Sequence, residues 1–225
     1  MSKALYHNIG GMRFWSEEEI ERRDAFTSLA AGTVRRALSM VNPAFRTFRV
    51  EGPCLTPRDF VSDAYSDDDL FTTNMCKAGR VIVLRGETTA STYAWSRVSG
   101  ERLPVCFWQV GKSFRTETND GASAAKLRFN EFWQQEFQVI YRVGTKADYR
   151  GALIRSLDAL WRCDTRIIDS DRLPSYSRST IDIEVPFNGA WKEIASCSIR
   201  ADYAPSVEVC EIAIGLDRVI ETGAF

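Results

Sequence analysis

The sequence predicts an α+β fold in which a mostly antiparallel β-sheet is flanked by helices. Three observations indicate this class: a long amphipathic helix opens the chain, many segments alternate apolar and polar residues, and hairpin-like loops join those segments. The chain has 225 residues, 44% of them apolar, which is enough for one good core. We therefore expect one domain over residues 1–225.

The first element is a helix from Ser16 to about Met40. Ser16 and Glu19 have the spacing of a capping box, and Asn42-Pro43 ends the helix. Apolar residues at helical spacing predict the face that meets the core. They are Ile20, Phe26, Leu29, Ala30, Val34, Ala37 and Leu38.

The remaining elements follow from the same patterns. Strands are predicted at 45–51, 81–84, 105–110, 129–141, 181–185, 192–199 and 207–213, the second of them short and buried. Helices are predicted at 88–97, 146–162 and 216–222. An exposed loop or turn is predicted at 65–73. Its acidic run, Asp67-Asp68-Asp69, is interpreted first as a solvated face, and a metal site is the second interpretation.

Composition excludes several classes of function. The net charge of −1 offers no large basic field for a nucleic-acid backbone, although it leaves room for a local basic pocket. The one histidine, His7, leaves little scope for His-based catalysis or His-rich metal sites. Neither a signal peptide nor a membrane span is predicted, so we expect a cytoplasmic protein. Reduced thiols are expected at the six scattered cysteines, Cys54, Cys76, Cys106, Cys163, Cys197 and Cys210.

The stretch FRTETNDGASAAKLRFNEF, residues 114–132, suggests a binding site on two strands. Arg115 and Glu117 are two apart and point to one face of a strand, and Arg128 and Phe132 return on its partner. Guanidinium groups can hold phosphate or carboxylate oxygens, a carboxylate can accept from an exocyclic amine, and a ring can stack on a purine. A charged hairpin with ordinary cross-strand pairs is the simpler interpretation of the pattern alone.

The order FRTE, loop, RFNEF resembles motif 2 of the class II aminoacyl-tRNA synthetases, over about 105–141. GLDR at 215–218 resembles their motif 3, over about 207–225, and the segment at about 29–57 resembles motif 1, which forms the dimer. The resemblance implies the class II synthetase fold over nearly the whole chain. It also implies a homodimer through motif 1.

Within that family the chain is similar to glycyl-tRNA synthetases. LRGETTASTYAW resembles their R-P-E-T-A-x-G segment, and LRFNEFWQQEF resembles their L-R-V-R-E-F-x-x-x-E segment. WKE at 191–193 with IRADY at 199–203, and EIAIGLDR at 211–218, resemble two further segments of the same enzymes. Four matches to one amino-acid specificity indicate glycine or another small amino acid.

The resemblance implies a role for each matched residue. Arg115 would bridge the α-phosphate of ATP and the amino-acid carboxylate, and with Arg218 it would be catalytic. The other expected ATP contacts are Glu117 to the adenine amino group, Arg128 and Arg218 to the outer phosphates, Phe132 under the adenine with Arg218 on its other face, and Glu211 to Mg²⁺. The expected amino-acid pocket comprises Glu87, Glu136 and Glu193 around the ammonium, Arg200 beside them, and Ala213.

Each match also has a plain structural interpretation. Glu87 could cap a helix, Glu136 and Glu193 could be strand-face acids, and Arg200 could make a surface pair. Two departures from the family bear on selectivity: Gly86 stands where proline is usual and predicts a looser loop, and Ala213 stands where the family has serine. No anticodon-binding domain is expected after motif 3, because the sequence ends at Phe225.

The expected function is ATP-dependent activation of glycine, or another small amino acid, as an aminoacyl-adenylate. ATP is the substrate and Mg²⁺ its partner ion. The acceptor would be a carrier protein, a small metabolite, a nucleotide or a nucleic-acid base rather than an ordinary whole tRNA. Three alternatives stand beside it: a minimal glycyl-tRNA ligase acting on an acceptor stem, a non-catalytic binding or dimerisation module such as a polymerase accessory subunit, and a regulatory paralogue that binds an amino acid without turnover.

Overall fold

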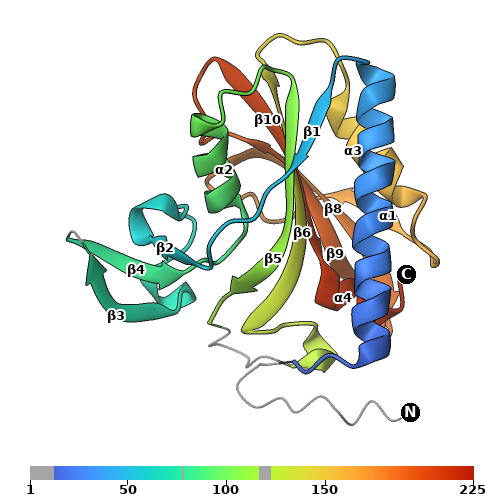
Figure 1. Ribbon diagram of the computed structural model, residues 1–225. Coiled ribbons are helices and arrows are strands. Elements are labelled where there is room, and N and C mark those ends of the chain that lie inside the picture. Colours follow the sequence, from blue (N-terminus) through green and yellow to red (C-terminus); the bar gives the residue numbers. More distant parts are fainter. Residues whose placement is uncertain (1–12, 78, 117–122) are drawn as a thin grey trace.

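The computed structural model describes residues 13–77, 79–116 and 123–225 (Figure 1). The helices are α1 (Glu17–Val41), α2 (Thr89–Val98), α3 (Tyr149–Asp158) and α4 (Leu216–Thr222), with single 3₁₀ turns η2 (Arg58–Phe60), η3 (Asp67–Asp69) and η4 (Ala124–Lys126). The strands are β1 (Arg46–Arg49), β2 (Leu55–Pro57), β3 (Thr72–Lys77), β4 (Arg80–Leu84), β5 (Val105–Phe114), β6 (Glu131–Arg142), β7 (Arg166–Asp169), β8 (Ser177–Phe187), β9 (Ala190–Arg200) and β10 (Val207–Gly215).

Two sheets form from the described strands. The main sheet has seven strands in the order β1-β5-β6-β10-β9-β8-β7, and the small one has the order β2-β4-β3. In the main sheet β1 runs parallel to β5, and every other neighbouring pair is antiparallel. The predicted α+β class with a mostly antiparallel sheet is therefore confirmed.

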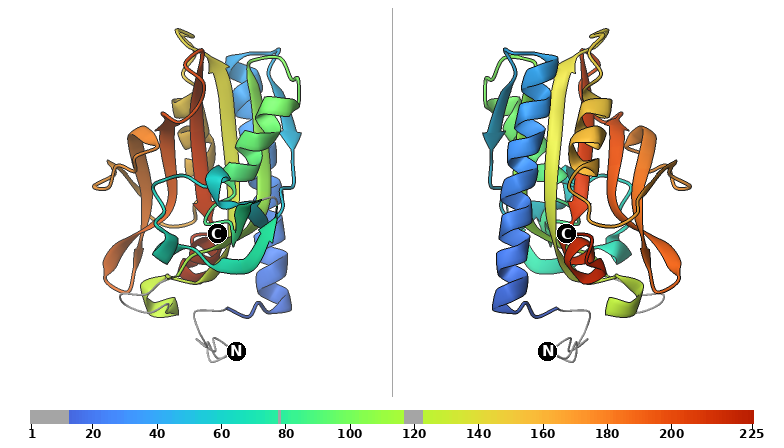
Figure 2. Two further views of the ribbon diagram at one scale, coloured as in Figure 1. Left: turned by 90° about the vertical axis from the view of Figure 1, so that its left-hand side faces the viewer. Right: turned by 90° about the vertical axis from the view of Figure 1, so that its right-hand side faces the viewer.

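The two faces of the main sheet have different partners. Figure 2 shows α1, α3 and α4 on one side of the sheet, and α2 with the small sheet on the other. Side chains alternate between these faces along each strand. In β6 and β10, Phe137 and Ile212 are fully buried in the core with α1 and α3, whereas their neighbours Glu136 and Glu211 face α2. One face is thus the apolar core, and the other is polar.

Helix α1 confirms the predicted capping box but corrects its apolar stripe. Ser16 Oγ accepts from the N–H of Glu19, and the Glu19 carboxylate accepts from the N–H of Ser16. Ile20 and Leu29, which we expected in the core, are 38% and 44% exposed. The buried line runs instead through Phe26, Thr27, Ala30, Ala31, Val34 and Leu38.

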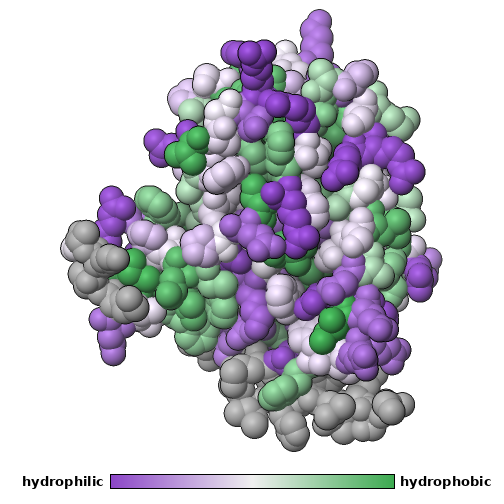
Figure 3. Space-filling model, in the orientation of Figure 1, coloured by the Kyte–Doolittle hydropathy of each residue, from purple (hydrophilic) through white to green (hydrophobic). Residues whose placement is uncertain are grey.

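The small sheet accounts for most of the differences from the predicted strands. The segment 81–84 is a strand, but Val81 is 50% exposed and only Val83 is fully buried, because β4 belongs to the small sheet and not to the main core. Strands β2, β3 and β7 were not predicted. In the hydropathy view, hydrophobic surface gathers over the region of the small sheet (Figure 3).

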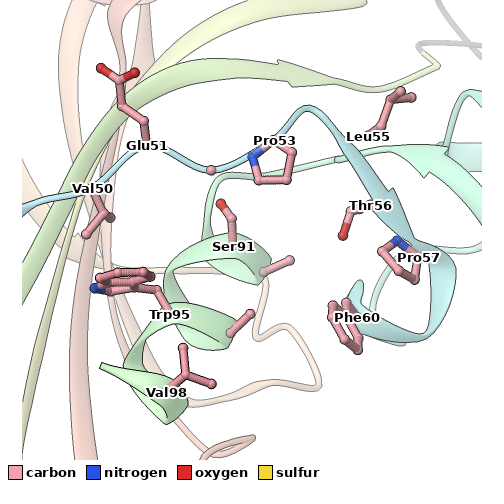
Figure 4. Close-up of a pocket in the computed structure, with 13 residues that line it drawn as sticks. Val50, Glu51, Pro53, Leu55, Thr56, Pro57, Phe60, Ser91, Trp95 and Val98 are labelled. Atoms are coloured by element: carbon pink, nitrogen blue, oxygen red, sulfur yellow. The ribbon is translucent and has the colours of Figure 1, made fainter. Parts of the chain in front are cut away.

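A cavity of about 370 Å³ lies between α2 and the chain from Val50 to Phe60 (Figure 4). Its lining from α2 includes Ser91 and Trp95, and that from the small sheet includes Leu55. The cavity is largely apolar, and Ser91 in its lining also contacts Gln109 on the polar side of the main sheet. Within the described ranges, no helix combines the length and the apolar character needed to cross a membrane.

Candidate active site

Polar side chains line the face of the main sheet that α2 covers, and most of them are buried. Two rows of cross-strand neighbours run across this face. They are Gln109, Glu136, Ala213 and Ser196 in one row, and Gln138, Glu211 and Ser198 in the other. Buried polar groups require partners, so such a face is either an internal network or a ligand site.

Three carboxylates and one guanidinium meet on this face, and we call Glu87, Glu136, Glu211 and Arg200 the acid cluster. Their exposed fractions are 6%, 1%, 5% and 4%. Arg200 Nη1 lies 2.9 Å from Glu211 Oε2 and 3.6 Å from Glu87 Oε1. The same guanidinium also pairs with the exposed Asp202. The structure therefore brings together four residues from β9, β6, β10 and the loop before α2.

Hydroxyl and amide groups hold the carboxylates of the acid cluster in place. Thr88 and Thr89, at the start of α2, both donate to Glu136 Oε2, and the Thr89 hydroxyl lies 3.3 Å from Glu211 Oε2. Gln138 Nε2 donates to Glu136 Oε1 and lies 3.4 Å from Glu211 Oε2. The N-terminal turn of α2 is thereby fixed against the sheet.

The acid cluster has three carboxyl groups and one guanidinium. Burial raises the pKa of Glu136 to about 7, and the hydrogen bonds from Thr88 and Thr89 oppose that rise. Burial also raises the pKa of Glu211 well above its usual value, against the attraction of Arg200. A cation placed among these carboxyl groups would stabilise their ionised form. A ligand ammonium group supplies such a cation.

Two tyrosines that the sequence analysis missed border the acid cluster. Tyr65 donates from its hydroxyl to Glu87 Oε2 at 2.9 Å, and the ring of Tyr176 lies 4.0 Å from Arg200 Cζ. Tyr65 belongs to the segment 65–73 that we expected to be exposed. Asp67, Asp68 and Asp69 are exposed, but Leu70 is buried and the N–H of Thr116 donates to Asp69 O at 3.1 Å, so the segment docks beside β5.

Arg115 lies next to the acid cluster, just after the end of β5. Its Cζ is 5.1 Å from the ring of Tyr65 and 5.1 Å from the ring of Phe132, and its Nε donates to Gly86 O at 2.9 Å. Phe132 is half-buried at the start of β6 and shares a face with Glu136. An arginine and an aromatic ring are therefore adjacent at the edge of the cluster.

Gly86 gives this edge a close-packed corner. A Cβ at this position would come within 3.0 Å of Leu70 Cδ2 and 3.4 Å of the Tyr65 ring. The neighbours Leu70 and Tyr65 thus leave little room for a side chain at Gly86, and Arg115 holds the loop that carries Glu87 by its bond to the Gly86 carbonyl.

The other predicted site residues are more spread out. Arg218, at the start of α4, donates to Leu127 O at 3.1 Å and to Glu193 O at 3.0 Å, and it pairs with Glu193 Oε2 at 3.3 Å. Glu193 thus partners an expected phosphate-binding arginine. Arg128 is exposed in the turn between η4 and β6. Glu117 lies outside the described residues.

Glu211 does not have the setting of a magnesium ligand. Its carboxylate is already paired with Arg200. Mg²⁺ requires near-octahedral coordination by oxygen atoms, and a guanidinium supplies none. Within the described parts of the chain, no group of three or more His, Cys, Asp or Glu side chains is arranged to hold a metal ion. We therefore derive no chemical step through a metal held by Glu211.

Comparison with solved structures shows which fold this is. The structure matches a prolyl-tRNA synthetase of Giardia lamblia in complex with prolyl-adenylate, with a TM-score of 0.71 and 14% identity over 96% of this chain and 48% of that one. It also matches a serine-tRNA ligase of Naegleria fowleri in complex with AMP, with a TM-score of 0.73 and 15% identity over 98% of this chain and 52% of that one. The chain has the class II aminoacyl-tRNA synthetase fold.

Sequence comparison finds glycine–tRNA ligases among the curated relatives. A glycine–tRNA ligase of Macrococcus caseolyticus is 31% identical over 135 residues, which are 54% of this chain and 29% of the relative. One of Agathobacter rectalis is 32% identical over 138 residues, 56% of this chain and 29% of the relative. The chain thus spans less than a third of the length of the curated relatives it matches. No protein-family model matches it. The resemblance to class II synthetases, and to glycyl-tRNA synthetases among them, is confirmed.

Proposed function

We propose that this chain activates glycine, or another amino acid of similar size, by forming an aminoacyl-adenylate from ATP. The observation that carries the proposal is the acid cluster with Arg115 and Phe132 at its edge. These residues offer a site for an ammonium group next to a site for phosphate and a purine. The relatives it resembles are glycine–tRNA ligases, which agrees with this pairing.

The acid cluster would recognise the ammonium group. Glu87, Glu136 and Glu211 provide buried carboxyl groups, and Arg200 is the cation that the described residues place among them. We assign Glu211 to this role in place of Mg²⁺ binding, because it is bonded into the cluster. A small zwitterion suits the site because Thr89 and Gln138 already occupy the space around the carboxylates.

Arg115 would hold the two reacting groups together. In the reaction, an oxygen of the amino-acid carboxylate attacks the α-phosphorus of ATP, the bond from that phosphorus to its bridging oxygen breaks, and pyrophosphate leaves. Negative charge spreads over the oxygens of the pentacovalent phosphorus, and a fixed guanidinium stabilises it. Arg115 is already oriented by its bond to Gly86 O, so little reorganisation is needed.

Phe132 and Arg218 would bind the nucleotide on the outer side of Arg115. A half-buried ring offers a stacking surface for adenine, and a guanidinium can hold phosphate or stack on the base. Arg128 would reach the outer phosphates from its exposed position, and Glu117 remains assigned to the adenine amino group by resemblance alone.

The activated amino acid must then pass to an acceptor. Our proposal from the sequence is a carrier protein, a small molecule or a nucleic-acid component other than an ordinary whole tRNA, and a minimal tRNA ligase acting on an acceptor stem is the alternative. We further propose a homodimer through motif 1, which includes the edge strand β1. Light scattering at micromolar concentration tests the dimer, and a monomer there would contradict it.

Amino-acid-dependent exchange of pyrophosphate into ATP tests the proposed reaction. We expect exchange with glycine, and loss of exchange with Arg115→Ala while the circular dichroism spectrum stays unchanged. No exchange with any of the twenty amino acids, together with no ATP binding, would favour a non-catalytic module. Full activity of Arg115→Ala would reject the role of Arg115.

A further inference from the structure

Arg13 lies before α1, outside every motif considered above, yet its side chain is almost completely buried. Its exposed side-chain fraction is 1%. Its guanidinium donates to Asp217 O at 2.9 Å and to Glu19 Oε1 at 3.0 Å, and it lies 3.6 Å from Asp217 Oδ1 and from Glu221 Oε2. Trp15 covers it, with the ring centroid 4.3 Å from Arg13 Cζ. One arginine therefore joins the start of α1 to both ends of α4.

Asp217 continues this connection to the main sheet. Its Oδ2 accepts from the N–H of Trp133 at 2.5 Å, and its side chain is 2% exposed. Through this hydrogen bond, the carboxylate of Asp217 joins the first turn of α4 to the first residues of strand β6. Arg13, Asp217 and Trp133 thus form one clamp across three elements.

The clamp adjoins the two groups proposed to hold adenine. Phe132 directly precedes Trp133 in β6, and Arg218 directly follows Asp217 in α4. The bond from Trp133 N–H to Asp217 therefore fixes the backbone beside Phe132 against the backbone beside Arg218. A purine between the ring of Phe132 and the guanidinium of Arg218 requires a fixed spacing, because stacking is sensitive to the distance between the planes.

We propose that Arg13 is a positioning residue for ATP, acting through Asp217 to hold Phe132 and Arg218 at the spacing that a bound adenine requires. This inference rests on the proposed function. It assigns the segment before α1, which does not touch the reacting atoms, to the nucleotide side of the site. Glu87, Glu211 and Arg200 of the acid cluster lie on other elements, and Glu136 lies three residues further along β6 than Trp133, so amino-acid binding should not depend on Arg13.

Charge explains why an arginine is needed at this position. Burial raises the pKa of the Asp217 carboxyl to about 6, and the attraction of Arg13 opposes that rise. Without Arg13 a buried carboxylate would lose its main counter-charge, and it would become protonated or move toward water. Either change weakens the bond to Trp133 N–H and frees the start of α4.

The test compares Arg13→Gln, Arg13→Lys and the control Arg150→Gln. Arg150 also binds a main-chain carbonyl, that of Cys197 at 2.9 Å, but it lies on α3 and has no bond to α4. The measurements are the KM values for ATP and for glycine in pyrophosphate exchange, and the Kd for ATP by calorimetry. Circular dichroism of each variant confirms folding.

We expect Arg13→Gln to raise the KM and Kd for ATP about tenfold with the KM for glycine unchanged. Arg13→Lys should recover part of the loss, and Arg150→Gln should resemble wild type. Unchanged ATP affinity in Arg13→Gln, or equal losses for ATP and glycine, would overturn the inference. If Arg13→Gln does not fold, unchanged ATP affinity in Arg13→Lys would overturn it as well, since an ammonium cannot make both guanidinium contacts. Wild-type protein that binds ATP without exchange would contradict the proposed reaction alone, and the ATP titration would still decide the role of Arg13.

Discussion

Arg200 donates from Nη1 to Glu211 Oε2 at 2.9 Å, and both side chains are at least nine-tenths buried on neighbouring strands. The pair is registered through β9 and β10, where Arg200 lies opposite Val209, two residues from Glu211. The same guanidinium also forms an ion pair with Glu87. Arg200 is thus the one cation that the described part of the structure places inside the acid cluster.

Replacing Arg200 with Met should destabilise the protein strongly. Removing one partner of a buried ion pair costs about 3–5 kcal/mol, because the other charge stays buried without compensation. The free energy of unfolding in urea measures the loss, which should be larger at pH 8 than at pH 5, where the carboxyls can take up protons. The control Arg166→Met breaks an exposed pair with Glu184 and should cost less than about 1 kcal/mol. Similar losses in both variants would contradict the buried cluster.

The raised pKa of Glu136 predicts a pH dependence of stability. Between the ordinary pKa of 4.5 and the folded value of about 7, the folded chain holds a proton that the unfolded chain has released. The free energy of unfolding should therefore fall as the pH rises through this window. Glu136→Gln should reduce the slope, and what remains would come from Glu211, Asp182 and Asp217, whose pKa values burial also raises. An unchanged slope in Glu136→Gln would contradict the assignment.

Tyr65→Phe should weaken amino-acid binding without unfolding the protein. The substitution removes the hydroxyl that donates to Glu87 and keeps the ring beside Arg115. A hydrogen bond to a charged group contributes about 1.5–3 kcal/mol, so the KM for glycine should rise at least several-fold. The KM for ATP should change little. A rise confined to ATP would show that Tyr65 serves the nucleotide instead.

Ala213→Ser should make the site more selective for glycine. Ala213 lies opposite Glu136 in the sheet, where the resembled family has a serine. The added hydroxyl takes space and offers a hydrogen bond, so activation of alanine should fall relative to glycine, by roughly 10-fold or more. The ratio of kcat/KM for glycine and alanine measures this. An unchanged ratio would mean that position 213 does not face the amino acid.

Strand alternation predicts which site residues of β6 share a face. Glu136 and Phe132 are four apart in β6, and period-2 alternation alone puts them on one face. Gln138 lies on that face for the same reason and could have been found by the same rule. Glu87, Glu136, Glu211 and Arg200 were assigned to the site from the family resemblance, because their meeting depends on how separate strands and the loop before α2 come together.

Other parts of the site could not be predicted because they depend on non-local docking. Tyr65 reaches Glu87 because the segment 65–73 packs beside β5. The polar, acid-rich sequence of that segment does not predict this packing. Arg13 reaches Asp217 across 204 positions of the chain. The exposure of Leu29 on α1 and of Val81 on β4 is likewise decided by which element each helix or strand meets.

Direct detection of the adenylate tests the central claim most directly. Stoichiometric protein is mixed with ATP, Mg²⁺ and glycine, quenched within one turnover, and analysed by mass spectrometry, with Arg115→Ala in parallel. The account predicts glycyl-adenylate and one equivalent of pyrophosphate from wild type, and neither from the variant. ATP bound but left intact with every small amino acid, or cleaved to ADP and phosphate, would contradict it.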